Sequence, residues 1–227
     1  PQGVARKQVE RCLEWMREYV KVHIISLLYA NILYQWGHAS LPVDLREDLL
    51  RSPEGSVTHR VNRALFDLGQ GAPLAPFLAQ YGHRGFTGSW DVFAPRWAEE
   101  PDRLARLVEN YGGEGRSDPA ALVEAQSQAA DAAMQALRQQ AKGISGSLSI
   151  VHVRLLRRYL DLREEQRFHF DRLLFALKKA LLRMGTDLLK DSAERIRWLQ
   201  WPELRDLSEG RLSVDEALEI IGRREAR

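Results

Sequence analysis

The stretch from Ala5 to Gly37, ARKQVERCLEWMREYVKVHIISLLYANILYQWG, carries the clearest structural signal in the chain. Its apolar residues recur at steps of three and four positions, which places them on one face of an α-helix. The residues of this face are Val9, Leu13, Met16, Val20, Ile24, Leu27, Leu28 and Ile32. The period predicts a long helix over residues 5–37. Gly37 is expected to end it, because glycine is common just after the last turn of a helix.

The same period predicts helices along most of the remaining chain. They are expected at 43–51, 56–68, 74–81, 101–111, 119–141, 148–190 (one long helix, or two joined at a kink), 202–207 and 214–224. Segments rich in glycine, proline or serine interrupt the pattern at 52–55, 112–119 and 143–147. Residues 195–200 are the one stretch that favours a strand. The predicted class is therefore all-α, a bundle-like packing of long antiparallel helices with one irregular glycine-rich loop.

The domain organisation follows from this pattern. We expect residues 1–227 to form a single helical domain, in which 1–111 supply the shorter helices and the loop and 119–227 supply the long C-terminal helices. The chain begins Pro-Gln-Gly-Val-Ala-Arg-Lys, without a methionine, and enters a helix almost at once. We therefore expect it to be a piece excised from a longer, multidomain protein.

Composition excludes several classes of protein. Hydrophobic residues make up 44% of 227 residues, enough for a sizeable core. The net charge of +2 argues against a strongly electrostatic nucleic-acid binder. The most apolar run, 22–36, is too short and too polar to span a bilayer. The lone Cys12 suits a reducing compartment, so we expect a cytoplasmic protein without membrane or nucleic-acid partners.

The glycine-rich loop, YGHRGFTGSWDVFAPRW at residues 81–97, is the first candidate site. Arg84 is suited to bind a carboxylate or phosphate through two parallel hydrogen bonds, and His83 to carry a proton. An alternative is purely structural, with Arg84 paired to Asp91 to hold the loop in shape. Spacing alone leaves both interpretations open.

The second candidate site lies in the predicted helix 148–190. Arg163 and Arg167 are four residues apart, so they share a helix face and repel each other unless negative charge lies opposite. Glu164 and Asp171 could supply that charge on a solvated, salt-bridged surface. The competing interpretation is a basic face turned into a cavity that accepts a polar ligand.

Other motifs are missing. The six histidines and Cys12 show no metal-ligand spacing, so no metal site is predicted. The chain contains no phosphate-binding P-loop and no nucleophile elbow. The arginines of 154–158 are interpreted as a solvated face, because no aromatic residues are interleaved with them for nucleic-acid binding.

Several stretches together resemble a known family. Tyr81-Gly-His-Arg-Gly, then Asp91, Pro95-Arg-Trp97 and Glu100-Pro101, is similar to a signature in the middle region of phosphoenolpyruvate-synthase-like phosphotransferases, of which the rifampin phosphotransferases are well-known members. Segments 56–65, 162–168, 181–185 and 196–204 resemble flanking parts of the same region. The resemblance covers most of residues 5–210 in the same order. One departure is that the family often has an acid where Ser89 or Trp90 stands.

The resemblance implies a function. In this family an ATP-grasp domain phosphorylates a histidine on a small swivelling domain, and the region similar to this chain binds the acceptor. Arg163 and Arg167 match two basic residues beside the acceptor hydroxyl, and Arg84 matches the loop arginine. Asp91 and Glu164 are expected in the same site, with His83 as the group that accepts the hydroxyl proton.

The expected function is therefore the acceptor-binding domain of a phosphoenolpyruvate-utilising phosphotransferase, with a small-molecule acceptor. ATP and magnesium are expected on other domains of the same polypeptide, because this chain has neither an ATP-grasp signature nor a phosphohistidine motif. It is expected to be catalytically incomplete alone. The alternative is a non-catalytic helical interaction scaffold whose site has decayed.

Overall fold

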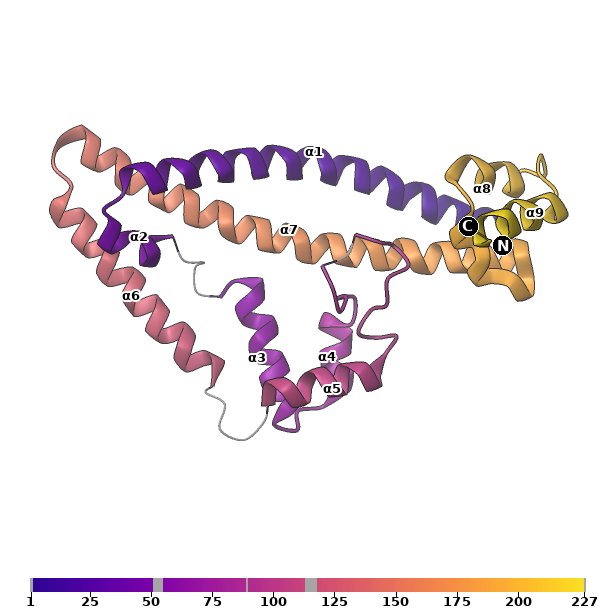
Figure 1. Ribbon diagram of the computed structural model, residues 1–227, viewed down its shortest axis with the longest axis horizontal. Coiled ribbons are helices and arrows are strands. Elements are labelled where there is room, and N and C mark those ends of the chain that lie inside the picture. The colour runs from indigo at the N-terminus through magenta and orange to yellow at the C-terminus, as the bar shows by residue number, and fades with distance from the viewer. Residues whose placement is uncertain (1, 51–54, 89, 113–117, 227) are drawn as a thin grey trace. The chain divides into compact units, whose positions relative to one another are not determined.

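The computed structural model describes residues 2–50, 55–88, 90–112 and 118–226, and every regular element in these ranges is helical (Figure 1). The elements are α1 (Gln2–Ser40), α2 (Val43–Leu49), α3 (Val57–Gly69), α4 (Leu74–Tyr81), α5 (Pro101–Gly112), α6 (Pro119–Gln140), α7 (Gly143–Leu189), the 3-10 helix η1 (Lys190–Trp198), α8 (Trp201–Ser208) and α9 (Val214–Glu225). The all-α prediction is confirmed. The predicted interruptions at 52–55 and 112–119, and Ser89, lie wholly or largely outside the described residues.

Three local predictions are wrong. Helix α1 continues past Gly37 to Ser40, and the Gly37 carbonyl accepts a hydrogen bond from the Leu41 amide at 3.0 Å. Residues 143–147 form the first turn of α7, because the chain turns earlier, at the extended Ala141. Residues 195–200 form no strand, since most of them belong to η1, whose Ile196 is buried.

The chain divides into two compact units, each described by itself. The first unit comprises Pro1–Tyr19, Gly85–Pro95 and Phe170–Arg227, and the second comprises Val20–Arg84 and Arg96–His169.

The first unit has a continuous apolar core. Its buried residues are Ala5, Val9, Leu177, Ala180, Leu181, Met184, Leu189, Ile196, Leu199, Leu204, Leu207, Ala217 and Ile221. Gly185 allows η1 to approach α7, because a Cβ at this position would overlap the carbonyl oxygen of Ala193. Glycine at position 185 thus permits a close backbone contact.

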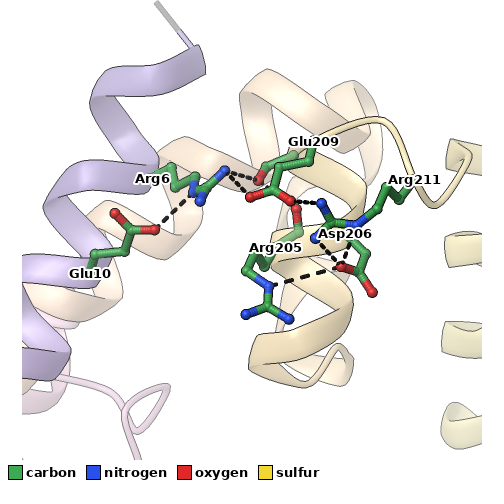
Figure 2. Close-up of polar contacts among 7 residues, drawn as sticks. Arg6, Glu10, Arg205, Asp206, Glu209 and Arg211 are labelled. Atoms are coloured by element: carbon green, nitrogen blue, oxygen red, sulfur yellow. Dashed lines mark hydrogen bonds and ion pairs between the residues drawn. The ribbon is translucent and has the colours of Figure 1, made fainter.

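Ion pairs fasten the surface of this unit. Figure 2 shows Arg6 of α1 between Glu10, at 2.9 Å, and Glu209 beside α8, at 2.7 Å. Arg211 in turn contacts both Glu209 and Asp206. The first turn of α1 is therefore tied through charged side chains to the end of α8.

A second ion pair joins α8 to α9. Arg224 donates to both carboxylate oxygens of Glu203, at 2.7 and 2.8 Å, and also to the Trp198 carbonyl oxygen. The hydrogen bond from Arg224 holds the pKa of Glu203 below its ordinary value. This pair fixes the position of α9 within the unit.

In the second unit, residues 20–40 of α1 and the first part of α7 lie antiparallel. Ser26 bonds Gln166, Tyr29 stacks on Tyr159 and Trp36 packs on His152, so positions rising along α1 meet positions falling along α7. A core of Leu41, Leu49, Ala133, Met134, Leu137 and Val153 joins α2, α6 and α7. Helix α3 packs against α4, α5 and α6. It begins at Ser56, whose hydroxyl accepts from the His59 amide as an N-cap.

Candidate functional site

Much of the loop signature is built into the core of the second unit. Tyr81, His83 and Trp97 are buried, and so is the side chain of Arg96. His83 and Tyr81 both meet the ring of Phe168 edge-on, with ring centroids 4.6 and 6.1 Å away. These two rings of the signature thus pack against one phenylalanine of α7, whereas Trp97 stacks on Phe77 of α4.

The backbone of the loop closes on itself in the same place. Ala98 donates to the Gly82 carbonyl oxygen at 2.9 Å, and Trp97 donates to the Arg84 carbonyl oxygen at 2.8 Å. A Cβ at Gly82 would lie 2.9 Å from the Cβ of Ala98. Glycine at position 82 is therefore required for this close approach.

Arg84 and Asp91 belong to different units. The Arg84 side chain is half-buried in the second unit. Asp91 is exposed in the first unit, where its Oδ1 accepts a hydrogen bond from the Phe93 amide at 2.9 Å. This local bond shapes the turn at 91–94, where Ala94 also donates to the Asp91 carbonyl oxygen.

The other candidate face, on α7, is tied to the start of α3. Thr58 donates to Oε2 of Glu164 at 2.8 Å, and Arg60 donates to Oε1 of Glu165 at 2.5 Å. Arg163 lies 3.4 Å from the other oxygen of Glu164. Glu164 therefore supplies negative charge beside Arg163 and also holds α3 against α7.

A cavity of about 780 Å³ opens between these elements, within the range of roughly 300–1,000 Å³ typical of ligand pockets. Its walls come from α1, α3, α7 and the residue after α2. They are formed by Ile24, Leu27, Leu28, Ala30, Asn31, Tyr34, Leu50, Ser56, Thr58, His59, Leu160, Arg163 and Glu164. The α1 side is mostly apolar, while α3 and α7 contribute hydroxyl, imidazole and charged groups. Such a cavity suits a largely apolar molecule with a few polar groups at one end.

The structure brings two of the predicted site residues to this cavity, Arg163 and Glu164. Arg167, Arg84 and His83 are not among the described residues that line it. Arg167 lies one turn further along α7 and is half-buried next to Phe168.

Sequence reasoning missed the α1 wall and the start of α3. Ile24 and Leu28 fit the apolar period, yet they are 52% and 58% exposed in the structure. A signal was present, because the run from 22 to 36 has more apolar residues than one helix face can hold. Excess apolar residues of this kind indicate a second surface, for a ligand or a partner.

Neither a metal centre nor a membrane span is found in the described parts of the chain. No group of three His, Cys, Asp or Glu side chains is close enough together there to hold a metal ion. None of the described helices has the length and apolar character needed to cross a membrane.

Part of the chain matches a known family of proteins. Residues 70–164 match the family model described as the rifampicin phosphotransferase fourth domain. The match includes the loop signature, α4 to α6 and the part of α7 that carries Leu160, Arg163 and Glu164. The resemblance to rifampin phosphotransferase-like, phosphoenolpyruvate-utilising enzymes is thereby confirmed. No curated protein sequence matches the chain.

Proposed function

We propose that this chain is the acceptor-binding part of a phosphotransferase similar to rifampicin phosphotransferase. One observation carries the proposal. The cavity combines an apolar α1 wall with the charged groups of Arg163 and Glu164, and both of these residues lie in the segment that matches the rifampicin phosphotransferase domain. The acceptor is proposed to be a bulky, largely apolar molecule with a hydroxyl group, which would lie toward the charged end.

The chemistry of phosphoryl transfer supports this assignment. Catalysis depends mainly on positioning and on positive charge around the moving group. Arg163 supplies a positive charge at the cavity edge, and Glu164 holds it in place. Roles for Arg84, Asp91, Arg167 and His83 toward the same ligand remain predictions.

The donor is proposed to be a phosphohistidine on another domain of the same polypeptide, charged by an ATP-grasp domain that holds ATP and magnesium. In that arrangement this chain contributes acceptor binding and is catalytically incomplete alone. A cytoplasmic location and the absence of nucleic-acid partners belong to the same proposal.

The direct test is a calorimetric titration of the chain with rifampicin. It compares two variants, each with a glutamate at one of two neighbouring isoleucines. Ile24 lines the cavity and is 52% exposed, whereas Ile25 is 56% exposed and is not among the lining residues. Ile24→Glu places a charge against the apolar wall, so it is expected to weaken binding by roughly tenfold or more. Ile25→Glu is expected to leave the affinity within about twofold. No binding to the unmodified chain, or equal loss in both variants, would contradict the proposal.

One observation favours a second candidate function, the helical interaction scaffold. Val22, Ile25 and Ile32 of α1 are more than half exposed and lie outside the lining of the cavity. A scaffold that docks through these residues predicts the opposite result from the two variants. Ile25→Glu would then disrupt association with a partner, and Ile24→Glu would have no special effect.

A further inference from the structure

We infer that His59 orients the ligand in the cavity by donating a hydrogen bond from Nε2 to a ligand oxygen. This inference rests on the proposed function, since it concerns a ligand in the same cavity. It adds a residue that the loop and arginine motifs do not include. It also narrows the ligand to apolar molecules that carry a carbonyl, ether or hydroxyl oxygen near the start of α3.

The position of His59 is the first observation. Its side chain lines the 780 Å³ cavity and also a second cavity of about 520 Å³, on the side of α3 that faces the start of α6. The ring therefore forms part of the wall shared by both spaces. A residue in this position can contact a molecule bound in either space.

The neighbours of His59 hold its backbone in place. The preceding residue, Thr58, bonds Glu164, and the following residue, Arg60, bonds Glu165, so α3 is fastened to α7 on both sides of position 59. The His59 amide is itself bonded to the N-cap hydroxyl of Ser56. A fixed backbone limits the positions that the side chain can reach, so less backbone entropy is lost when it binds a ligand.

The hydrogen bonds of the two ring nitrogens decide what the ring can do. Nδ1 is buried and has no hydrogen-bond partner among the described residues. Nε2 is not one of the buried side-chain nitrogen and oxygen atoms that lack a partner. A buried N–H without an acceptor is rarer and less favourable than a buried acceptor without a donor. The neutral ring therefore carries its proton on Nε2, the accessible nitrogen, and presents it as a donor.

Two probes of matched shape test the inference. 2-Acetylnaphthalene carries a carbonyl oxygen, and 2-isopropenylnaphthalene has a CH₂ group in its place. Both are titrated into the chain in the same buffer. The measured quantity is the affinity for the ketone divided by the affinity for the hydrocarbon. A neutral hydrogen bond corresponds to roughly a three- to tenfold change in affinity. That ratio is therefore expected to fall by about this factor in His59→Phe. His59→Gln, which keeps a donor near the position of Nε2, is expected to restore it.

A second readout uses the unmodified chain, so it does not depend on how His59→Phe folds. In ¹⁵N spectra of histidine-labelled protein, the ketone is expected to shift the His59 Nε2 signal and the hydrocarbon to leave it in place. The His59 signal is identified as the one that is absent from the spectrum of His59→Gln.

The outcomes separate the two proposals. If both probes bind and neither the affinity ratio nor the Nε2 signal depends on the carbonyl, the role of His59 is overturned while the cavity remains a binding site. If neither probe nor rifampicin binds the unmodified chain, the proposed function is overturned and the inference with it.

Discussion

The two units differ in what their largest groups of apolar residues do, although each unit has a buried core. In the first unit, residues such as Leu181, Ile196 and Ile221 are buried together, and ion pairs fasten the surrounding helices. In the second unit, Ile24 and Leu28 of α1 line an open cavity and remain more than half exposed. Apolar side chains in a closed core contribute to folding, whereas those beside a cavity are available to a ligand. Under the proposed function, the cavity of the second unit is the part of the chain that binds the ligand.

The largest effect on stability is expected in the core of the first unit. Ile221 is fully buried there, so Ile221→Ala would leave a cavity and lower the free energy of unfolding by about 2–5 kcal/mol. Chemical denaturation monitored by circular dichroism measures this change. A loss below about 1 kcal/mol would show that the first unit is loosely packed, and would contradict the interpretation of its apolar residues as a closed core.

A smaller effect is expected where α7 and η1 meet. Gly185→Ala introduces a methyl group against the carbonyl oxygen of Ala193, and relieving that overlap is expected to cost about 1–3 kcal/mol. Thermal melting measures it. A Cβ at Gly222 of α9 would meet no neighbouring atom within 4 Å, so Gly222→Ala is the matched control and should not destabilise the chain.

The ion pair between Glu203 and Arg224 should make the first unit sensitive to acid. The hydrogen bond from Arg224 lowers the pKa of Glu203 in the folded state, so the pair contributes stability above the ordinary value of 4.5. That contribution is lost as pH falls through the lowered value. Because both side chains are partly exposed, Glu203→Gln is expected to cost only about 0.5–1 kcal/mol at neutral pH.

Melting curves between about pH 6 and about pH 3 measure this dependence. Glu203→Gln should reduce the loss of stability below the ordinary pKa, because the amide does not titrate. An unchanged acid profile in the variant would mean that other carboxylates, such as Glu225 beside Arg195, dominate the response.

The smallest effect on stability is expected at the cavity wall. Leu28 is 58% exposed, so Leu28→Ala should change the free energy of unfolding by less than about 0.5 kcal/mol. The same substitution should weaken rifampicin binding, because it removes apolar surface from the wall. A destabilisation as large as that of Ile221→Ala would show that Leu28 belongs to a core, and the comparison between the units would fail.

The sequence predicted those parts of the structure that depend on local signals. Ser56 and Ser213 are followed by helices because their hydroxyl groups cap the first turn, and both caps are present in the structure. The prediction of a strand at 195–200 was wrong because the alternation of apolar and polar residues is not the only pattern in this segment. Ile196 and Leu199 are three residues apart, which also fits a 3-10 helix, and both are buried in the core of the first unit.

The candidate site was only partly predictable, for a physical reason. Arg163 and Glu164 could be recognised because their charges on one helix require an explanation. Spacing alone did not identify the α1 wall, since Ile24 and Leu28 have the spacing of core residues, and only the excess of apolar residues in 22–36 indicated a second surface. His59 was missed because its significance lies in a ring nitrogen without a partner, which is a property of the folded structure.

Binding of the acceptor by the second unit can be measured directly by NMR. The isoleucine and leucine methyl groups are labelled, and their signals are followed during titration with rifampicin. Signals of the cavity wall are expected to shift, led by Ile24, Leu28 and Leu160, while those of Ile196 and Ile221 in the first unit are expected to stay in place. Shifts confined to the first unit, or a spectrum that does not change at saturating rifampicin, would contradict binding of the acceptor by the second unit.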